Sequence, residues 1–249
     1  MDRRKYLGFV VFPAGIVGLL AFLFFVAKVD IFRTRTLEQS LEELAGAPDT
    51  AIRWKAAADL RKRGDPAAIP ALRKAIHEDQ NPAVRMHAAA ALASLSTPTA
   101  AVDIAPLLAD ESTDVRRVAA YLLGDLRSEV AREPLRKALS DPCEPVRWNV
   151  AVALARLGDR SGLATLHDML RAPAPRSVGG AASTMVPGAT APAPEPDRDV
   201  HQSALLALLV VGGPESVRPI ETFIEAEVEP DLALLAKEIA GKLKTRTVN

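Results

Sequence analysis

The 249-residue chain contains a single cysteine, Cys143. One cysteine cannot form an internal disulfide, and it cannot supply the several thiolates of a structural zinc cage. Net charge is also lacking, because 31 basic side chains balance 31 acidic ones. A neutral chain has no overall field that attracts phosphate groups, so the composition argues against nucleic acid as a partner. We therefore expect neither a disulfide framework nor a nucleic-acid-binding protein.

Catalytic motifs are missing as well. The sequence holds no G-x-S-x-G, Walker A or G-x-G-x-x-G pattern. Its four histidines are scattered, and none has another suitable metal ligand at helical i, i+4 spacing: His77, His87, His167 and His201. The sequence therefore predicts no catalytic residue, no metal and no cofactor, and it favours a protein that is not an enzyme.

Aromatic residues make up only 4% of the chain, and six of the seven phenylalanines lie within the first 32 positions. There, the stretch from Leu7 to Ala27 contains no charged residue. A helix of that length measures about 31 Å, which matches a bilayer core of roughly 30 Å. We predict a single transmembrane helix within residues 7–29, preceded by a short basic tail at residues 1–6.

A cleaved signal peptide is the alternative, because Arg3, Arg4 and Lys5 form a basic start. The apolar run is longer than a typical signal sequence and no A-x-A-like site follows it, which favours a retained anchor. Three basic residues precede the run and three follow it closely, so the orientation stays open. The tight N-terminal cluster favours an extracytoplasmic body, whereas the free thiol of Cys143 favours a reducing compartment.

The rest of the chain is periodic. An apolar residue followed by arginine recurs at spacings of 32, 31 and 31 residues: Ile52-Arg53, Val84-Arg85, Val115-Arg116 and Val146-Arg147. Val200-His201 follows after one further period plus an insertion of 23 residues, and Leu232-Ala233 is the last copy in phase. Periods of this length are typical of repeat proteins.

Each copy continues as an amphipathic helix. Counted from the arginine position, small residues occupy plus three and leucine usually occupies plus seven. A second apolar segment follows in each repeat, at 69–76, 102–108, 130–139, 163–170 and 217–224. Neither helix can bury its apolar side alone, so we predict an all-α, right-handed stack of about five helix pairs that share one core.

These helices define the predicted domain organisation. A juxtamembrane segment and a capping helix occupy 30–48, the repeats occupy 49–171, and the last repeats with a C-terminal capping helix occupy 199–244. The intervening residues 172–198 are rich in proline and alanine and carry little apolar bulk. Such a segment cannot recover its ordering entropy, so we predict a mobile loop there.

The pattern D-x-x-x-x-V-R-x-x-A-A-x-x-L, followed by a turn and A-x-P-x-L, resembles the HEAT-repeat superfamily. It is most similar to the short bilin-lyase-type (PBS lyase HEAT-like) repeats. The resemblance implies an α-solenoid in which aspartate and arginine positions form a ladder between repeats: Asp79, Arg85, Asp110, Arg116, Asp141 and Arg147. The end repeats depart from the pattern, with Ala47 in place of the first aspartate and His201 and Ala233 in place of arginine.

The resemblance also bears on function. It implies that the helices carrying the Val-Arg pairs line the concave side. On these helices the residue one position after the arginine, and its neighbours on the same side, face solvent. Residue types that are enriched in interfaces occur there, and we predict a partner-binding set of Trp54, Met86, Arg117, Tyr121 and Trp148. Strong curvature or the insertion would instead bury these side chains, and the sequence leaves that alternative open.

The sequence thus predicts a membrane-anchored, non-catalytic scaffold that binds a protein or peptide partner on its concave helix face. The alternative, implied by the repeat type alone, is a bilin-lyase-like enzyme or an accessory subunit of a modifying enzyme.

Overall fold

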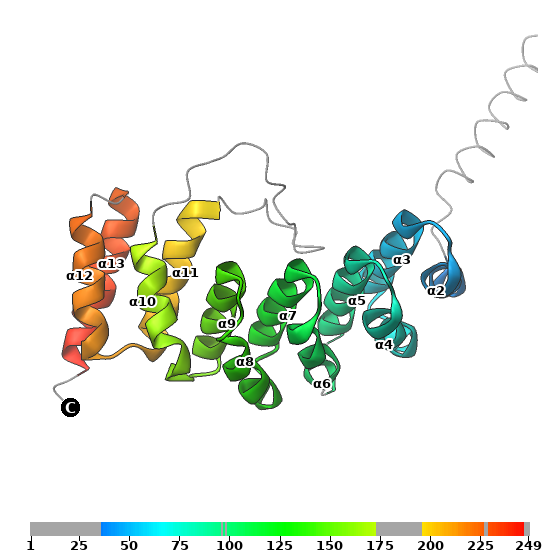
Figure 1. Ribbon diagram of the computed structural model, residues 1–249, viewed down its shortest axis with the longest axis horizontal. Coiled ribbons are helices and arrows are strands. Elements are labelled where there is room, and N and C mark those ends of the chain that lie inside the picture. Colours follow the sequence, from blue (N-terminus) through cyan, green and yellow to red (C-terminus); the bar gives the residue numbers. More distant parts are fainter. Residues whose placement is uncertain (1–35, 96, 98, 173–195, 227–228, 247–249) are drawn as a thin grey trace, which may run out of the picture. The chain divides into compact units, whose positions relative to one another are not determined.

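The fold is taken from a computed structural model that describes residues 36–95, 97, 99–172, 196–226 and 229–246 (Figure 1). The predicted tail, the predicted transmembrane helix and most of the predicted loop lie outside these residues. No helix among the described residues has both the length and the apolar character needed to cross a membrane. The chain divides into two units, residues 1–39 and 40–249.

Only residues 36–39 of the first unit are described. They open helix α2 (Leu37–Gly46), which falls within the predicted capping helix at 30–48. Thr36 Oγ1 accepts a hydrogen bond from the Gln39 backbone at 3.2 Å, and Gln39 Oε1 accepts one from the Thr36 backbone at 3.0 Å. This reciprocal pair satisfies two N–H groups that the first helical turn would otherwise leave without partners.

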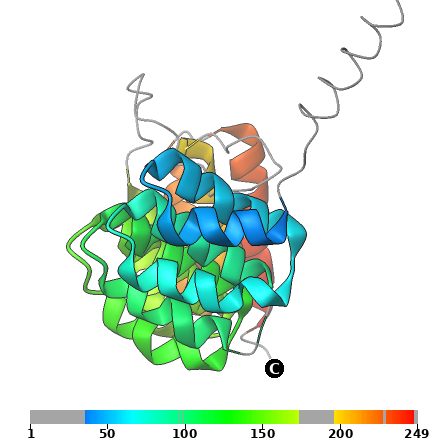
Figure 2. The ribbon, with the colours of Figure 1, turned by 90° about the vertical axis from the view of Figure 1, so that its right-hand side faces the viewer.

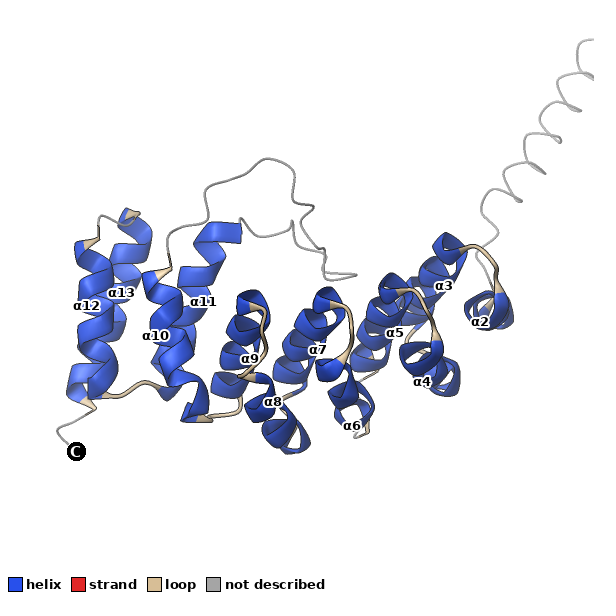
Figure 3. Cartoon of the chain, in the orientation of Figure 1, coloured by secondary structure: helices blue, strands red, loops and turns tan. Residues whose placement is uncertain are grey.

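All regular structure among the described residues of the second unit is helical (Figure 3). One layer consists of the helices that carry the apolar-basic pairs or, in α13, the corresponding Leu232-Ala233, and we call them the first-layer helices. They are α3 (Thr50–Arg63), α5 (Pro82–Ser94), α7 (Thr113–Leu126), α9 (Glu144–Arg156), α11 (Pro196–Val211) and α13 (Pro230–Thr245). Each packs against the next one along the chain.

The second-layer helices lie between them in sequence and complete the helix pairs. They are α4 (Ile69–Glu78), α6 (Ala100–Ile104), α8 (Arg132–Ala138), α10 (Leu163–Arg171) and α12 (Val217–Glu225). Short 3₁₀ turns lead into four of them and extend α6: η1 (Pro66–Ala68), η2 (Ala105–Ala109), η3 (Glu129–Ala131), η4 (Arg160–Gly162) and η5 (Pro214–Ser216). Viewed from the end, the helices of successive repeats lie one behind another (Figure 2).

The core runs between the two layers. The plus-seven leucines are at most 1% exposed: Leu60, Leu92, Leu123, Leu154 and Leu208. One wholly buried apolar residue from each second-layer helix faces this line: Leu72, Ile104, Leu135, Leu166 and Ile220. Burying a side chain of this size contributes about 1.5–3 kcal/mol, so this double row is the main source of stability. The predicted helical repeat with a shared core is confirmed.

Helix boundaries differ from the prediction in two places. The second-layer helix predicted at 102–108 is split, because α6 ends at Ile104 and the chain continues as the 3₁₀ turn η2. Pro106 causes the split, since it lacks the N–H that an α-helix needs at that position. Helix α11 begins at Pro196, inside the segment predicted as a loop (172–198), and proline suits the first turn of a helix.

Two glycines end first-layer helices as their sequence positions suggest. Gly64 follows α3 with φ of 64° and Gly158 follows α9 with φ of 71°, a left-handed conformation that glycine adopts without steric cost. Gly212, at the corresponding place after α11, is not left-handed. A Cβ at this position would lie 2.4 Å from the Leu208 carbonyl oxygen, so close packing requires glycine there.

Candidate interaction surface and inter-repeat ladder

Arginine–aspartate pairs tie α3, α5 and α7 each to the turn that precedes the next first-layer helix. In each pair the arginine Nε donates to Oδ2 of the aspartate and Nη2 donates to Oδ1. The Nε–Oδ2 distances are 2.7, 2.8 and 2.7 Å in the pairs Arg53–Asp79, Arg85–Asp110 and Arg116–Asp141. Bidentate contacts of this kind are charge-assisted and geometrically specific. The series begins at Arg53, which was not among the six predicted ladder residues.

Both partners of a rung also hold their own turns. Arg85 Nη1 donates to the carbonyl oxygens of Asp79 and Gln80, at 2.9 and 3.1 Å. Asp110 Oδ1 accepts the backbone N–H of Ser112 at 2.8 Å. The same contacts recur in the other two rungs. Each rung therefore fixes two turns and one helix–helix junction together.

The rungs shift the ionisation of their members. Burial would raise the pKa of Asp79 and Asp141, but the hydrogen bonds from arginine and from the backbone outweigh it, so both pKa values lie below the usual range. The pKa of each rung arginine is raised, chiefly by its hydrogen bond to aspartate and against the opposing effect of burial. The Arg53–Asp79 and Arg116–Asp141 rungs are therefore ion pairs at neutral pH.

Arg147 occupies the next ladder position but differs from the other rung arginines. Its Nη1 donates to the carbonyl oxygens of Asp141 and Pro142, at 2.8 and 3.1 Å. Among the described residues no carboxylate pairs with it. The ladder is thus complete at three junctions and lacks its acid at the junction between α9 and α11.

A second series of ion pairs links the second-layer side of neighbouring repeats, and the sequence analysis missed it. Arg73 on α4 donates to Asp103 on α6 at 2.7 Å, and Arg136 on α8 donates to Asp159 at 2.8 Å. The 30-residue separation of Arg73 and Asp103 is close to one repeat period, and that spacing was the available signal.

The predicted partner-binding residues differ in exposure. Trp54 is half-buried because its ring stacks on His87 of α5, with ring centroids 4.9 Å apart and planes inclined by 26°. Met86 is half-buried as well. Trp148 is half-buried and packs against the apolar core of the C-terminal repeats. Each of these side chains therefore presents part of its surface to solvent.

Tyr121 and Arg117, both on α7, complete the predicted set. Tyr121 is 38% exposed, and the Arg156 guanidinium lies 5.4 Å from its ring centroid, within cation–π range. Arg117 is half-buried and its Nη2 donates to Asp114 Oδ1 at 3.1 Å. Tyr121 is thus the most open aromatic side chain of the set, and Arg117 is held by its own helix.

Three larger apolar exposures lie towards the C-terminal end, and the predicted set omitted them. Leu206 and Val210 on α11 are 46% and 57% exposed, and Leu234 on α13 is 70% exposed. Leu206 holds the same plus-five position as Tyr121 and Leu234 the same plus-one position as the tryptophans, which was the signal in the sequence. We use the term outer face for the side of the first-layer helices that points away from the core, which the sequence analysis placed on the concave side of the repeats. It consists of Trp54, Met86, Tyr121, Trp148, Val152, Leu206, Val210 and Leu234.

His87 is the most perturbed titratable group that the structure describes. Burial, aided by the charge of Arg61, lowers its pKa to about 4, so the imidazole is neutral at physiological pH. Its Nδ1 is buried and has no hydrogen-bond partner among the described residues. Where the chain is described, no three histidine, cysteine, aspartate or glutamate side chains gather in a way that would hold a metal ion.

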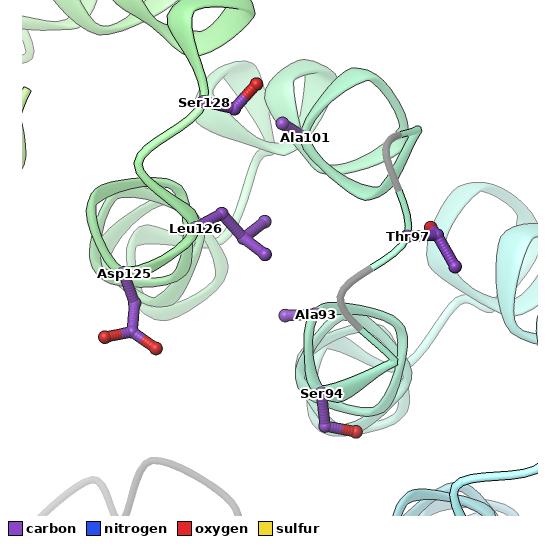
Figure 4. A pocket seen from close by; sticks show the side chains of 7 residues that line it. All are labelled: Ala93, Ser94, Thr97, Ala101, Asp125, Leu126 and Ser128. Carbon is purple, nitrogen blue, oxygen red and sulfur yellow. The ribbon is translucent and has the colours of Figure 1, made fainter.

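A shallow hollow of about 570 Å³ lies where α5 and α7 end and α6 begins (Figure 4). It is lined by Ala93, Ser94, Thr97, Ala101, Asp125, Leu126 and Ser128. Asp125 is the one carboxylate in this lining, and His87 does not belong to it.

The model of HEAT repeats matches residues 37–113 and 102–185. No curated protein matches the sequence. Among solved structures, the complex of CpcE and CpcF of phycocyanin lyase from Nostoc sp. PCC7120 is similar at 18% identity, with a TM-score of 0.45 over 84% of this chain and 95% of that one. An engineered protein and a designed armadillo repeat protein are each similar at 17% identity with a TM-score of 0.49, over 84% of this chain and 96% and 100% of theirs. Because the repeat model covers more than half of its length, the chain belongs to the HEAT repeat family.

Proposed function

We propose that the chain is a non-catalytic scaffold that binds a protein or peptide partner on its outer face. The observation that carries this proposal is the exposure of Tyr121, Leu206 and Val210, which flank the half-buried Trp148 and Val152 on the helix between them. Helices α7, α9 and α11 are consecutive neighbours, so we infer that these side chains lie along one apolar strip, with the Arg156 guanidinium beside Tyr121. Apolar strips of this kind on soluble surfaces mark sites of macromolecular contact.

The ladder supports the same reading. Its bidentate ion pairs fix the junctions from α3 to α9, so the part of the strip on α7 and α9 is carried on a framework that loses little freedom when a partner binds. Aromatic side chains in such a setting are frequent energetic anchors of interfaces. We place Tyr121 and Trp148 at the centre of the proposed site, with the exposed edges of Trp54 and Met86 extending it towards the first repeat.

We also propose that residues 7–29 anchor the scaffold in a membrane. The support is the uncharged run in the sequence, because this segment lies outside the described residues. Resistance of the full chain to alkaline carbonate extraction, and its loss when residues 7–27 carry four lysine substitutions, would support the anchor. Release of the unaltered chain by carbonate would refute it. The side of the membrane on which the repeats lie is left to protease protection of the same preparations.

Site-specific photo-crosslinking tests the outer face. A photoreactive amino acid replaces Tyr121 or Leu206 in separate full-length variants expressed in native membranes. Matched controls replace Val102 or Val130, which are 52% and 53% exposed but belong to the second-layer side of the repeats. We expect one partner band from both outer-face positions and none from the controls. Equal labelling from both sides of the stack would refute the proposed site.

A second arm uses substitutions without a probe. Replacement of Trp54 and Trp148 together by alanine should lower capture of the cross-linked partner by tenfold or more, because truncating interface anchors commonly costs 2 kcal/mol or more. Helical circular dichroism reports whether the variant remains folded. Undiminished capture by the folded variant would contradict the proposal. No contact among the described residues favours the bilin-lyase-like alternative.

A further inference from the structure

The junction between α9 and α11 contains an arginine placed as in the ladder, Arg147, to which no carboxylate of the described residues is bonded. In the three complete rungs, Nη1 of the arginine donates to two carbonyl oxygens of its own turn, which leaves Nε and Nη2 aimed at the aspartate of the next repeat. Arg147 Nη1 makes the same two backbone contacts, at 2.8 and 3.1 Å against 2.9 and 3.1 Å for Arg85. The guanidinium is therefore held in the orientation of a rung.

The opposite side of this junction keeps the backbone of a rung. Ala172 lies 31 residues after Asp141, at the position where the next aspartate would stand. Its φ and ψ are −58° and 130°, close to −72° and 128° at Asp79 and to −61° and 148° at Asp110. All three residues are the first non-helical residue after a second-layer helix. Only the carboxylate side chain is missing.

A further contact shows that the turn at Ala172 packs against the next first-layer helix as in the complete rungs. His201 occupies the arginine position of the next repeat, and its Nε2 lies 3.2 Å from the Ala172 carbonyl oxygen. That contact corresponds to the bond from Arg85 Nη1 to the Asp79 carbonyl oxygen. Arg147 is half-buried, as Arg53 and Arg116 are in complete rungs, whereas Arg85 is 6% exposed. Part of the Arg147 side chain is thus open to solvent.

We propose that Arg147 binds an aspartate or glutamate side chain supplied by the protein partner, which completes the fourth rung. This inference rests on the proposed function, because it assigns one polar contact of the same partner. A guanidinium edge matches a planar carboxylate with two parallel hydrogen bonds. Two backbone acceptors already hold this one in place, so little side-chain freedom is lost on binding. Trp148, next in sequence, brings the site to the apolar strip.

The first test measures the site alone, without the partner. The probe is acetate, titrated into the ¹⁵N-labelled full chain in detergent micelles with chloride replaced at constant ionic strength. The Nε–H signal of Arg147, assigned by its loss in Arg147→Lys, should move downfield with acetate and not with chloride. In Ala172→Asp the Nε–H signal should already lie downfield and should not respond to acetate. In the isosteric control Ala172→Asn it should still respond. The inference would be overturned if the Arg147 signal of the unaltered chain did not respond to acetate. This holds whether Arg147 stays unbound or a carboxylate of this chain already occupies it.

The second test asks whether the partner uses the site. Ala172→Asp should raise the thermal midpoint by about 2–4 °C by completing the rung in cis. It should also lower photo-crosslinking of the partner from position 121 about tenfold, because the partner carboxylate then has no place to bind. Ala172→Asn should do neither. If Ala172→Asp still cross-linked the partner at full yield, this inference would be overturned and the proposed function would stand. If the unaltered chain showed no position-specific crosslinking, the proposed function itself would be refuted.

Discussion

Replacement of Asp141 by asparagine should uncouple the third and fourth repeats. Asp141 and Arg116 have only 5% and 13% of their side chains exposed, and their Nε–Oδ2 distance is 2.7 Å. Removing one member of a buried pair commonly costs 3–5 kcal/mol, because the other charge is left uncompensated. Arg116 retains two backbone carbonyl acceptors, at 2.9 and 3.2 Å, so we place the loss at about 2–3 kcal/mol, at or just below the lower limit of that range. The thermal midpoint should fall by about 5–10 °C.

The matched control is Asp125→Asn. Asp125 also pairs with an arginine across the α7–α9 junction, but it is 71% exposed and 3.8 Å from Arg156. An exposed pair of this kind contributes at most about 0.5 kcal/mol. Calorimetric and urea unfolding of both variants should separate them clearly. If Asp141→Asn shifted the midpoint no more than Asp125→Asn does, the claim that the ladder couples the repeats would be wrong.

The pH dependence of the same variant supplies an independent check. The pKa of Asp141 is lower in the folded chain than its unfolded value near 3.8, so its contribution to stability is complete above that value. Protonation of the folded carboxyl removes the contribution as the pH falls further. The difference in unfolding free energy between the unaltered chain and Asp141→Asn should therefore be constant from pH 7 to about 4.5 and shrink below it.

Two further predictions concern His87 and the close helix contacts. The pKa of His87 is lowered from 6.5 to about 4, so between these pH values the unfolded chain is protonated at His87 and the folded chain is not. The free energy of unfolding should therefore decline from pH 6.5 to 4 more steeply in the unaltered chain than in His87→Gln. Trp54 fluorescence should change with a midpoint near pH 4 in the unaltered chain and not in that variant. A Cβ at Gly124 would lie 2.7 Å from Ala153, so Gly124→Ala should cost about 1–3 kcal/mol in denaturant unfolding, whereas Gly241→Ala, with open space around it, should stabilise by about 0.5–1 kcal/mol. Equal effects of the two alanine substitutions would contradict the close packing of α7 on α9.

The fold could be predicted because its determinants repeat in the sequence. The plus-seven leucines and the small residues at plus three set the buried side of each first-layer helix, whatever its neighbours are. Local breaks in helices were harder to place. Pro106 splits one second-layer helix, and Arg127 takes the left-handed conformation, with φ of 48°, that glycine supplies after α3 and α9. A single side chain decides such details against the average pattern.

The candidate site could be predicted only in part, because exposure depends on contacts between repeats. Trp54 and Trp148 share the plus-one position, yet His87 covers one face of the first and the C-terminal core supports the second. In the first repeat, His87 at plus two of the next repeat covers one face of the plus-one side chain Trp54. That relation between helices 31 residues apart becomes visible only once their packing is known.

The α9–α11 junction, where the ladder lacks a carboxylate among the described residues, is also where apolar side chains of the outer face are exposed. From α3 to α9 every junction has a rung, while the α9–α11 junction has Arg147 without an aspartate, and Leu206 and Val210 are exposed on the α11 side of it. A partner that contacts this strip and supplies a carboxylate would contribute the inter-repeat tie that the described residues lack at the α9–α11 junction. Binding would then stabilise the C-terminal repeats against the rest, because a ligand that binds only the folded state adds its binding free energy to the stability of that state. Recognition and repeat coupling would thus depend on the same guanidinium.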